Sequence, residues 1–156
     1  MRLRSEPLRA ALARLAFMLC VAFLATGAQA APIEPGQIRV IDGDTIAVGE
    51  THYRLVGFDT PETGPRARCS AERALGAEAT QRLRRIVAGG GLDLRRVSCR
   101  CPAGTEGTRA CNYGRLCGTL TAGGRDVGEI LIAAGLARLY PFGAQVGPAT
   151  WCGRNG

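Results

Sequence analysis

Three short polar clusters in this 156-residue chain carry the groups best able to do chemistry. The first, Asp42–Thr45, reads Asp-Gly-Asp-Thr and places two carboxylates beside a glycine that lets the backbone bend. The second is Arg54 with, five residues later, Asp59–Glu62, which reads Asp-Thr-Pro-Glu. The third is Tyr113–Arg115, which reads Tyr-Gly-Arg. Together they supply oxygen ligands for a hard cation, a spare carboxylate and two guanidinium groups.

This inventory suits the cleavage of a phosphodiester bond. A hard cation and arginines neutralise a phosphate, while a carboxylate handles the attacking water. Pro61 holds Thr60 extended, so the Thr60 carbonyl can point outward as a further ligand. Each cluster alone also has a purely structural interpretation, as a turn, a strand end or a hairpin corner. The functional hypothesis therefore rests on their combination.

The segments around the clusters show the polar and apolar alternation of short strands, and Gly49-Glu50 marks a tight turn between two of them. The segments predicted as strands are 37–41, 45–48, 51–58, 92–99 and 115–121. A Gly/Pro/Thr-rich loop separates the last two, which we expect to pair with each other.

Two helices are predicted between and after these strands. The first runs from a Ser70 cap to about Ala88, with one apolar face, and three glycines stop it. That face comprises Leu75, Ala79, Leu83 and Ile86. The second begins at Asp126, which forms a capping box with Glu129, and ends at Gly135.

This order of elements predicts an α+β domain with two main helices around a small antiparallel sheet, and a five-stranded barrel of the OB type fits it. Other small α+β domains fit the order as well. Hydrophobic residues make up 46% of the chain and mean hydropathy is +0.03, which favours a packed core over a long disordered chain. Aromatic residues make up only 5%, so we expect an aliphatic core.

Residues 1–30 have the layout of a secretory signal peptide. Four arginines in residues 1–14 precede a strongly apolar stretch, 15–25, and then Ala28-Gln29-Ala30. An uncleaved membrane anchor is the alternative, but 11 strongly apolar residues fall short of the ~20 that a spanning helix needs. Without this leader the net charge falls from +7 to +4, a mild preference for polyanions.

The mature chain therefore divides into three parts. Residues 31–36 form a lead-in, 37–140 the folded domain, and 141–156 an irregular tail rich in glycine and proline, which Trp151 packs onto the domain. We expect a monomer without stable membrane association after cleavage, located in a periplasm or outside the cell.

Six cysteines remain after the leader, and an even number in a small exported domain predicts three disulfides. A zinc site built from residues 99, 101, 111 and 117 is the alternative, but their spacing lacks paired C-x-x-C knuckles. Two strands that pair would join Cys101 to Cys111 and Cys99 to Cys117. The crossed arrangement, 99 with 111 and 101 with 117, needs a register shift and stays open. Cys69 and Cys152 are left to form the third bridge.

Four ordered motifs give the chain a resemblance to the staphylococcal nuclease, or thermonuclease, family. They are Val40–Ile46 (VIDGDTI), Tyr53–Thr63 (YRLVGFDTPET), Tyr113–Arg115 (YGR) and Gly135–Ala137 (GLA). The family fold is an OB barrel with helices. The chain departs from the family in its tail, which cannot form the family's terminal helix, and in its six cysteines.

The resemblance implies a role for each site residue. Asp44, Asp59 and the Thr60 carbonyl resemble the ligands of a catalytic calcium ion, supported by Asp42. Glu62 resembles the residue that activates or orients the attacking water, and Arg54 and Arg115 the pair that stabilises the transition state. Tyr113 resembles a nucleotide-contacting residue, and Tyr140 is a candidate for another.

The expected function is therefore that of an exported, calcium-dependent, sugar-nonspecific endonuclease acting on DNA and RNA and leaving 3′-phosphate products. The alternative is a non-catalytic OB module that binds single-stranded nucleic acid through basic and aromatic groups.

Overall fold

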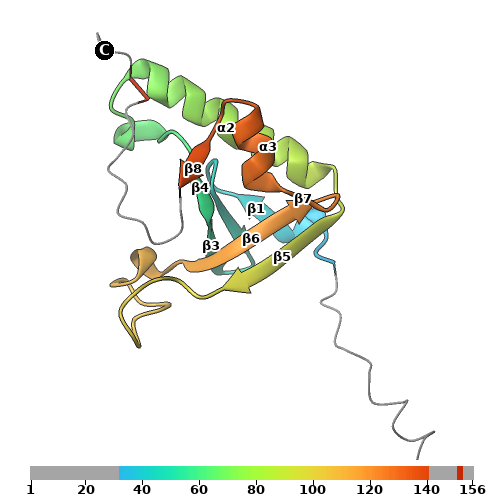
Figure 1. Cartoon of the computed structure of the whole chain (residues 1–156), viewed down its shortest axis with the longest axis vertical. Helices are drawn as coiled ribbons and strands as arrows, with labels where there is room; N and C mark the ends of the chain where they lie inside the picture. The colour runs from blue at the N-terminus through green and yellow to red at the C-terminus, as the bar shows by residue number, and fades with distance from the viewer. Residues whose placement is uncertain (1–31, 141–150, 153–156) are drawn as a thin grey trace, which may run out of the picture. The chain divides into compact units, whose positions relative to one another are not determined.

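The computed structural model describes residues 32–140 and 151–152, whose strands form a curled sheet with two helices beside it (Figure 1). The strands are β1 (Ile38–Val40), β2 (Thr45–Val48), β3 (Thr51–Leu55), β4 (Gly57–Asp59), β5 (Leu92–Val97), β6 (Leu116–Ala122), β7 (Arg125–Asp126) and β8 (Arg138–Tyr140). The α-helices are α2 (Ser70–Ala88) and α3 (Val127–Ala133), and the single-turn 3-10 helices are η1 (Pro35–Gln37), η2 (Gly64–Arg66) and η3 (Asn112–Gly114). The predicted signal peptide and most of the predicted tail lie outside the described residues.

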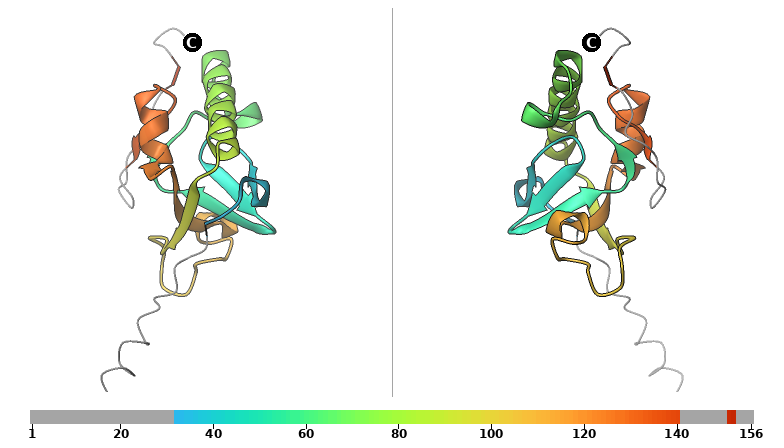
Figure 2. Two further views of the ribbon diagram at one scale, coloured as in Figure 1. Left: turned by 90° about the vertical axis from the view of Figure 1, so that its right-hand side faces the viewer. Right: turned by 90° about the vertical axis from the view of Figure 1, so that its left-hand side faces the viewer.

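The main sheet has the strand order β1-β2-β3-β6-β5, with β7 paired to β6. A bridge from Ile33 to Leu92 brings the lead-in segment against β5 at the open side of the sheet. The predicted α+β fold, a five-stranded OB-type barrel with two helices, is confirmed. Both helices lie toward one end of the sheet, and the loop between β5 and β6 projects from the opposite end (Figure 2).

Two details of the sheet differ from the prediction. The pair β3–β6 is parallel, because the chain returns to β3 only after α2 and β5. The single returning strand predicted over 51–58 is divided at Val56 into β3 and β4. Gly57 has a φ of +96°, which an L side chain rarely adopts, and β4 turns there to pair with β8. The division matters because it carries Asp59 back toward Arg54.

The core is aliphatic, as predicted. The largest fully buried apolar side chains are Ile46, Leu55, Leu83, Leu92, Leu120, Leu131 and Val127. Helix α3 approaches β4 closely because Gly128 has no side chain, and a Cβ there would lie 2.9 Å from the Phe58 Cγ atom. None of the helices in residues 32–140 is long and apolar enough to cross a membrane.

Helix α2 has the predicted length, and the predicted Ala79 and Leu83 lie at the centre of its buried face. Leu75 and Ile86 are only partly buried, whereas Glu72 is fully buried. The N-cap is Cys69 and not Ser70, because the Cys69 Sγ accepts the hydrogen bond from the Glu72 backbone N–H at 3.4 Å. Helix α3 is capped as predicted by Asp126, whose carboxylate accepts hydrogen bonds from the backbone amides of Gly128 and Glu129.

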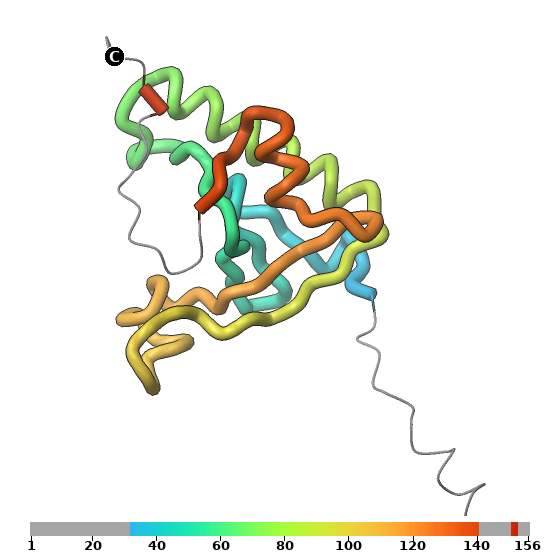
Figure 3. Tube along the Cα trace, in the orientation of Figure 1, coloured from blue at the N-terminus to red at the C-terminus, as the bar shows by residue number. Residues whose placement is uncertain are grey.

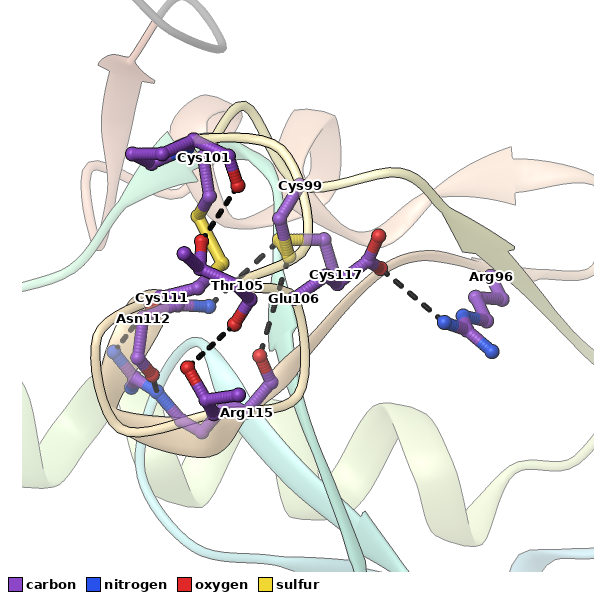
Figure 4. The surroundings of a disulfide bond; sticks show 11 residues. Arg96, Cys99, Cys101, Thr105, Glu106, Cys111, Asn112, Arg115 and Cys117 are labelled. Carbon is purple, nitrogen blue, oxygen red and sulfur yellow. Dashed lines mark hydrogen bonds and ion pairs between the residues drawn. A yellow bond between two sulfur atoms is a disulfide. The ribbon is translucent and has the colours of Figure 1, made fainter.

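All six cysteines in the described residues are paired as disulfides, in the nested arrangement. The pairs are Cys69–Cys152, Cys99–Cys117 and Cys101–Cys111, with Cα–Cα distances of 6.0, 5.3 and 5.6 Å. The last two fasten the loop between β5 and β6 (Figure 4), and the first joins residue 152 to the start of α2 (Figure 3). Because each sulfur is bonded to another, none of the six is a thiolate that could hold zinc.

The Cys69–Cys152 bridge should contribute more to stability than Cys101–Cys111, because it spans 83 residues and the other spans 10. Chain entropy predicts a loss of about 4–5 kcal/mol for replacing the first pair by serine and about 3 kcal/mol for the second. Urea unfolding of the two double-serine variants measures both losses. An equal or reversed order would contradict the expectation.

Candidate active site

The turn between β1 and β2 ends at Asp44, the residue directly before β2. Asp42 accepts a hydrogen bond from the Asp44 backbone N–H at 3.2 Å, which closes the turn on itself. Gly43 must be glycine for steric reasons, since a Cβ there would lie 2.7 Å from the Thr60 Oγ1 atom. The turn therefore packs directly against the segment that follows β4.

Thr60 holds the Asp44 carboxylate from that segment. Its backbone N–H and its hydroxyl both donate to Asp44 Oδ2, at 3.2 and 3.0 Å. Asp44 is only 8% exposed. Burial raises the pKa of Asp44 to about 6, against the opposing effect of the Arg54 guanidinium, with Asp42 adding to the rise.

The Arg54 guanidinium lies between two carboxylates. Its Nη1 is 2.7 Å from Asp44 Oδ2 and its Nη2 is 3.1 Å from Asp59 Oδ1. The same nitrogens donate to the backbone carbonyls of Leu55 and Phe58, at 3.0 and 3.2 Å. The planar fork is thus fixed by four acceptors, and it draws the two predicted ligand carboxylates to one place.

Arg138 holds the other side of Asp59. Residues 59 and 138 are register partners in the β4–β8 pair, and Arg138 Nη2 lies 2.9 Å from Asp59 Oδ2. The Arg138 guanidinium also lies 5.0 Å from the ring centroid of Trp151, which anchors the tail as predicted. Arg138 was not predicted as a site residue. Its position directly after the Gly-Leu-Ala motif is the signal that could have identified it.

Glu62 is the most accessible of the predicted catalytic groups, with 48% of its side chain exposed. It pairs with Arg66 on η2, whose Nε lies 3.0 Å from Glu62 Oε2. Arg66 also reaches to 3.6 Å from Asp42 and was not predicted as a site residue. Glu62 thus faces the cleft with one oxygen engaged by an exposed, long side chain.

Arg115 enters from η3 and the start of β6 (Figure 4). Its Nη1 donates to the Thr45 hydroxyl at 3.1 Å, and Asn112 accepts two further hydrogen bonds from it. Burial lowers the pKa of Arg115 from its ordinary value, and the nearby Arg54 charge lowers it further. Tyr113 is 82% exposed, with the Arg115 guanidinium 5.9 Å from its ring centroid.

These groups line one cleft of about 340 Å³. It contains the predicted Asp42, Asp44, Arg54, Asp59, Thr60, Glu62, Tyr113 and Arg115. A larger adjoining cleft of about 850 Å³ shares Arg54, Asp59 and Glu62 and is also lined by Tyr140 and Trp151. The structure therefore brings every predicted site residue except Tyr140 into the smaller cleft, with Tyr140 in its continuation.

The donor set of the smaller cleft fits a hard divalent cation. Two carboxylates, Asp44 and Asp59, converge there beside Thr60, and the described residues lining the cleft include no histidine or cysteine. Calcium prefers such all-oxygen surroundings, whereas zinc prefers imidazole and thiolate ligands. In this structure the two carboxylates are neutralised by Arg54 and Arg138.

Comparison with known proteins gives two findings. A family model described as staphylococcal nuclease homologue matches residues 52–148, a span that begins after Asp44 and includes Arg54, Asp59, Glu62 and Arg115. The chain is also 36% identical over 107 residues to Endonuclease YncB of Bacillus subtilis. That alignment covers 65% of this chain and 45% of the relative, so the chain spans about half the length of the curated protein it matches.

Replacing Gly43 by alanine should disturb the site through packing. The new methyl group would collide with the Thr60 side chain and pull it from Asp44, an overpacking that costs about 1–3 kcal/mol of unfolding free energy. Gly36→Ala is the matched control, because a Cβ there meets nothing within 4 Å. Urea denaturation compares the two, and equal stability of both variants would show that the turn is not packed as described.

Proposed function

Since this chain belongs to the staphylococcal nuclease family, we propose that it is an exported, calcium-dependent endonuclease. It would hydrolyse phosphodiester bonds of both DNA and RNA and leave 3′-phosphate ends. The single observation that carries the proposal is the Arg54 fork, which gathers Asp44 and Asp59 in the cleft that Glu62 and Arg115 also line. The family match and the similarity to an endonuclease support the nuclease part of this proposal.

Arg54 and Arg115 are the groups that would bind the scissile phosphate. Both line the smaller cleft, and guanidinium groups donate paired hydrogen bonds to phosphate oxygens. The Asn112 and Thr45 contacts fix Arg115 before substrate arrives. Arg115 keeps one further N–H on each Nη nitrogen and can direct them at the phosphate without reorganisation as negative charge builds up in the transition state. Arg54 must exchange some of its four acceptors for phosphate oxygens.

Glu62 is the group that would act on the attacking water. Its carboxylate is accessible and faces the same cleft, so it can accept the proton as the water oxygen forms its bond to phosphorus. The bond from phosphorus to the 5′-oxygen then breaks with its electron pair passing to that oxygen, which takes a proton from solvent water and leaves as a 5′-hydroxyl, and the phosphate remains on the 3′-oxygen. Departure of Arg66 from Glu62 would free the carboxylate for this role, and Arg66 is mostly exposed.

Asp44, Asp59 and the Thr60 carbonyl are the groups that would hold calcium, with Asp42 holding the turn that carries Asp44. A calcium ion bound there supplies positive charge beside the phosphate. Arg54 contacts both of these carboxylates and is also a proposed phosphate-binding group, so the calcium site and the phosphate site share one guanidinium.

The adjoining cleft offers the surface for the rest of the nucleic acid. Tyr113 is exposed at the boundary of the two clefts, and Tyr140 lies farther along the larger one. Aromatic rings stack on bases with little regard to sequence, which suits an enzyme of low base specificity.

Export of the protein is proposed from two features. Residues 1–30 have a basic start, an apolar middle and a small-residue cleavage site. Three disulfides are typical of small domains in oxidising compartments. The mature protein would act as a monomer in a periplasm or outside the cell, without stable membrane association.

Activity should depend on calcium bound through Asp44. Degradation of a plasmid should stop in excess chelator and return with calcium but not with zinc. Asp44→Asn should weaken calcium binding, measured by titration calorimetry, as well as turnover. Asp93→Asn on β5 is the control, since Asp93 pairs with Arg95 away from either cleft. Full activity in chelator would contradict the proposal, and so would an inactive wild-type protein that only binds nucleic acid.

Arg54→Lys and Glu62→Gln should each leave a folded protein with impaired turnover. Lysine keeps the charge of Arg54 but loses the fork that reaches two carboxylates and a phosphate. Loss of one such transition-state contact costs about 10²–10³ in kcat, and loss of a general base about 10²–10⁴. Arg85→Lys and Glu78→Gln, on the exposed face of α2, are matched controls. Near-normal kcat in either site variant would refute that residue's role.

A further inference from the structure

Glu72, in the first turn of α2, is the most deeply buried carboxylate among the described residues. Its side chain is 1% exposed, against 11% for Asp44, 27% for Asp59 and 48% for Glu62. Burying a carboxylate is unfavourable unless hydrogen bonds replace the lost water. An apolar residue would fill this position on a helix at lower cost, so the contacts of Glu72 require an explanation.

Those contacts are with the backbone of the loop that carries Glu62. Glu72 Oε2 accepts the Arg68 backbone N–H at 2.7 Å, and the Arg68 Nε lies 3.4 Å from the same oxygen. The Glu62 backbone N–H is close enough to the Glu72 carboxylate to help lower its pKa. Burial raises the pKa of Glu72, but the hydrogen bonds from Arg68 and Glu62 outweigh it and leave the pKa below its ordinary value. One carboxylate thus holds the Arg68 end of the segment 62–68 by a hydrogen bond and lies near the backbone amide at its Glu62 end.

Gly76 fixes the same segment from one turn farther along α2. A Cβ at Gly76 would lie 2.6 Å from the Pro61 carbonyl oxygen and 2.7 Å from that of Glu62. Helix α2 therefore lies against the backbone of Glu62 at two points. Glu72 lies near the Glu62 backbone amide, and Gly76 packs against the Glu62 carbonyl. The Cys69–Cys152 disulfide covers this contact, since the Cys152 Sγ lies 3.9 Å from Glu72 Oε2.

We propose that Glu72 is a positioning residue that sets the place of the Glu62 carboxylate in the cleft by holding the Glu62 and Arg68 backbone amides. This inference rests on the proposed function of Glu62. Glu62 itself is half exposed and its side-chain partner Arg66 is mostly exposed, so the side chain has little else to fix it. The backbone contacts to Glu72 and α2 supply that constraint.

Glu72→Gln should therefore lower kcat by about 10-fold to 100-fold, the range expected for a misplaced catalytic group, and leave KM for DNA nearly unchanged. Since Glu72 acts through Glu62, adding Glu72→Gln to Glu62→Gln should cause no further loss of kcat. Glu78→Gln, on the exposed face of the same helix, is the control. Wild-type kcat in Glu72→Gln, or losses that multiply in the double variant, would overturn the proposal.

Amide hydrogen exchange tests the contact without reference to activity. In Glu72→Gln the amides of residues 62 and 68 should exchange faster, while the middle of α2 keeps its protection. If that variant does not fold, Glu72→Asp keeps the charge with a shorter reach and should show the same changes to a smaller degree. Unchanged exchange at both amides would refute the contact, whereas an inactive wild-type protein with the expected exchange pattern would refute the proposed function instead.

Discussion

The candidate site depends on one guanidinium held between two carboxylates. Arg54 is placed by β3, Asp44 by the turn before β2 and Asp59 by the end of β4, and the fork links all three. Removing Arg54 would leave the buried Asp44 carboxylate without its ion-pair partner, which is far more costly than losing an exposed ion pair. The rest of the fold can be understood from this requirement. The break at Gly57 turns the chain so that Asp59 reaches the fork, and the β4–β8 pair adds Arg138 on the far side of the same carboxylate.

In the loop between β5 and β6, disulfide bonds provide the rigidity that a hydrophobic core provides elsewhere in the domain. Of residues 98–115 only Cys111 is buried, so apolar packing cannot hold this loop in place. Two disulfides do so, and they lie beside Asn112, which accepts hydrogen bonds from Arg115 and donates toward the Cys117 sulfur (Figure 4). The second phosphate-binding arginine is thus oriented by a residue whose own position depends on covalent cross-links. A chain of few aromatic residues gains rigidity there that its side-chain packing does not provide.

The sequence was informative where a local pattern had one physical meaning. Alternation and the Gly49 turn predict the β2–β3 hairpin, and Asp126 predicts the start of α3. Features set by distant contacts were not predictable in this way. The parallel β3–β6 pair requires a crossover that no local pattern encodes. Glu72 was missed because helical periodicity locates apolar faces, and an acid in the first turn of a helix is commonly a solvated partner of the helix dipole. Arg66 has no local feature that marks it as a site residue, and η2 brings it to the site. Arg138 follows the Gly-Leu-Ala motif directly, but only the β4–β8 pair shows that it reaches Asp59.

The two pairs that close the site join segments very far apart in the chain. Thr45 meets Arg115 across 70 residues, and Asp59 meets Arg138 across 79. Contacts of such sequence separation carry a large loop-closure cost and are satisfied only when most of the topology exists. An isolated peptide that contains only one part of the cleft would therefore not form the site. Until β8 has docked against β4, Asp59 lacks its second ion pair, and until β6 lies beside β3, Arg115 lacks its contact with Thr45, so the chemical competence of the chain is a property of the finished topology alone.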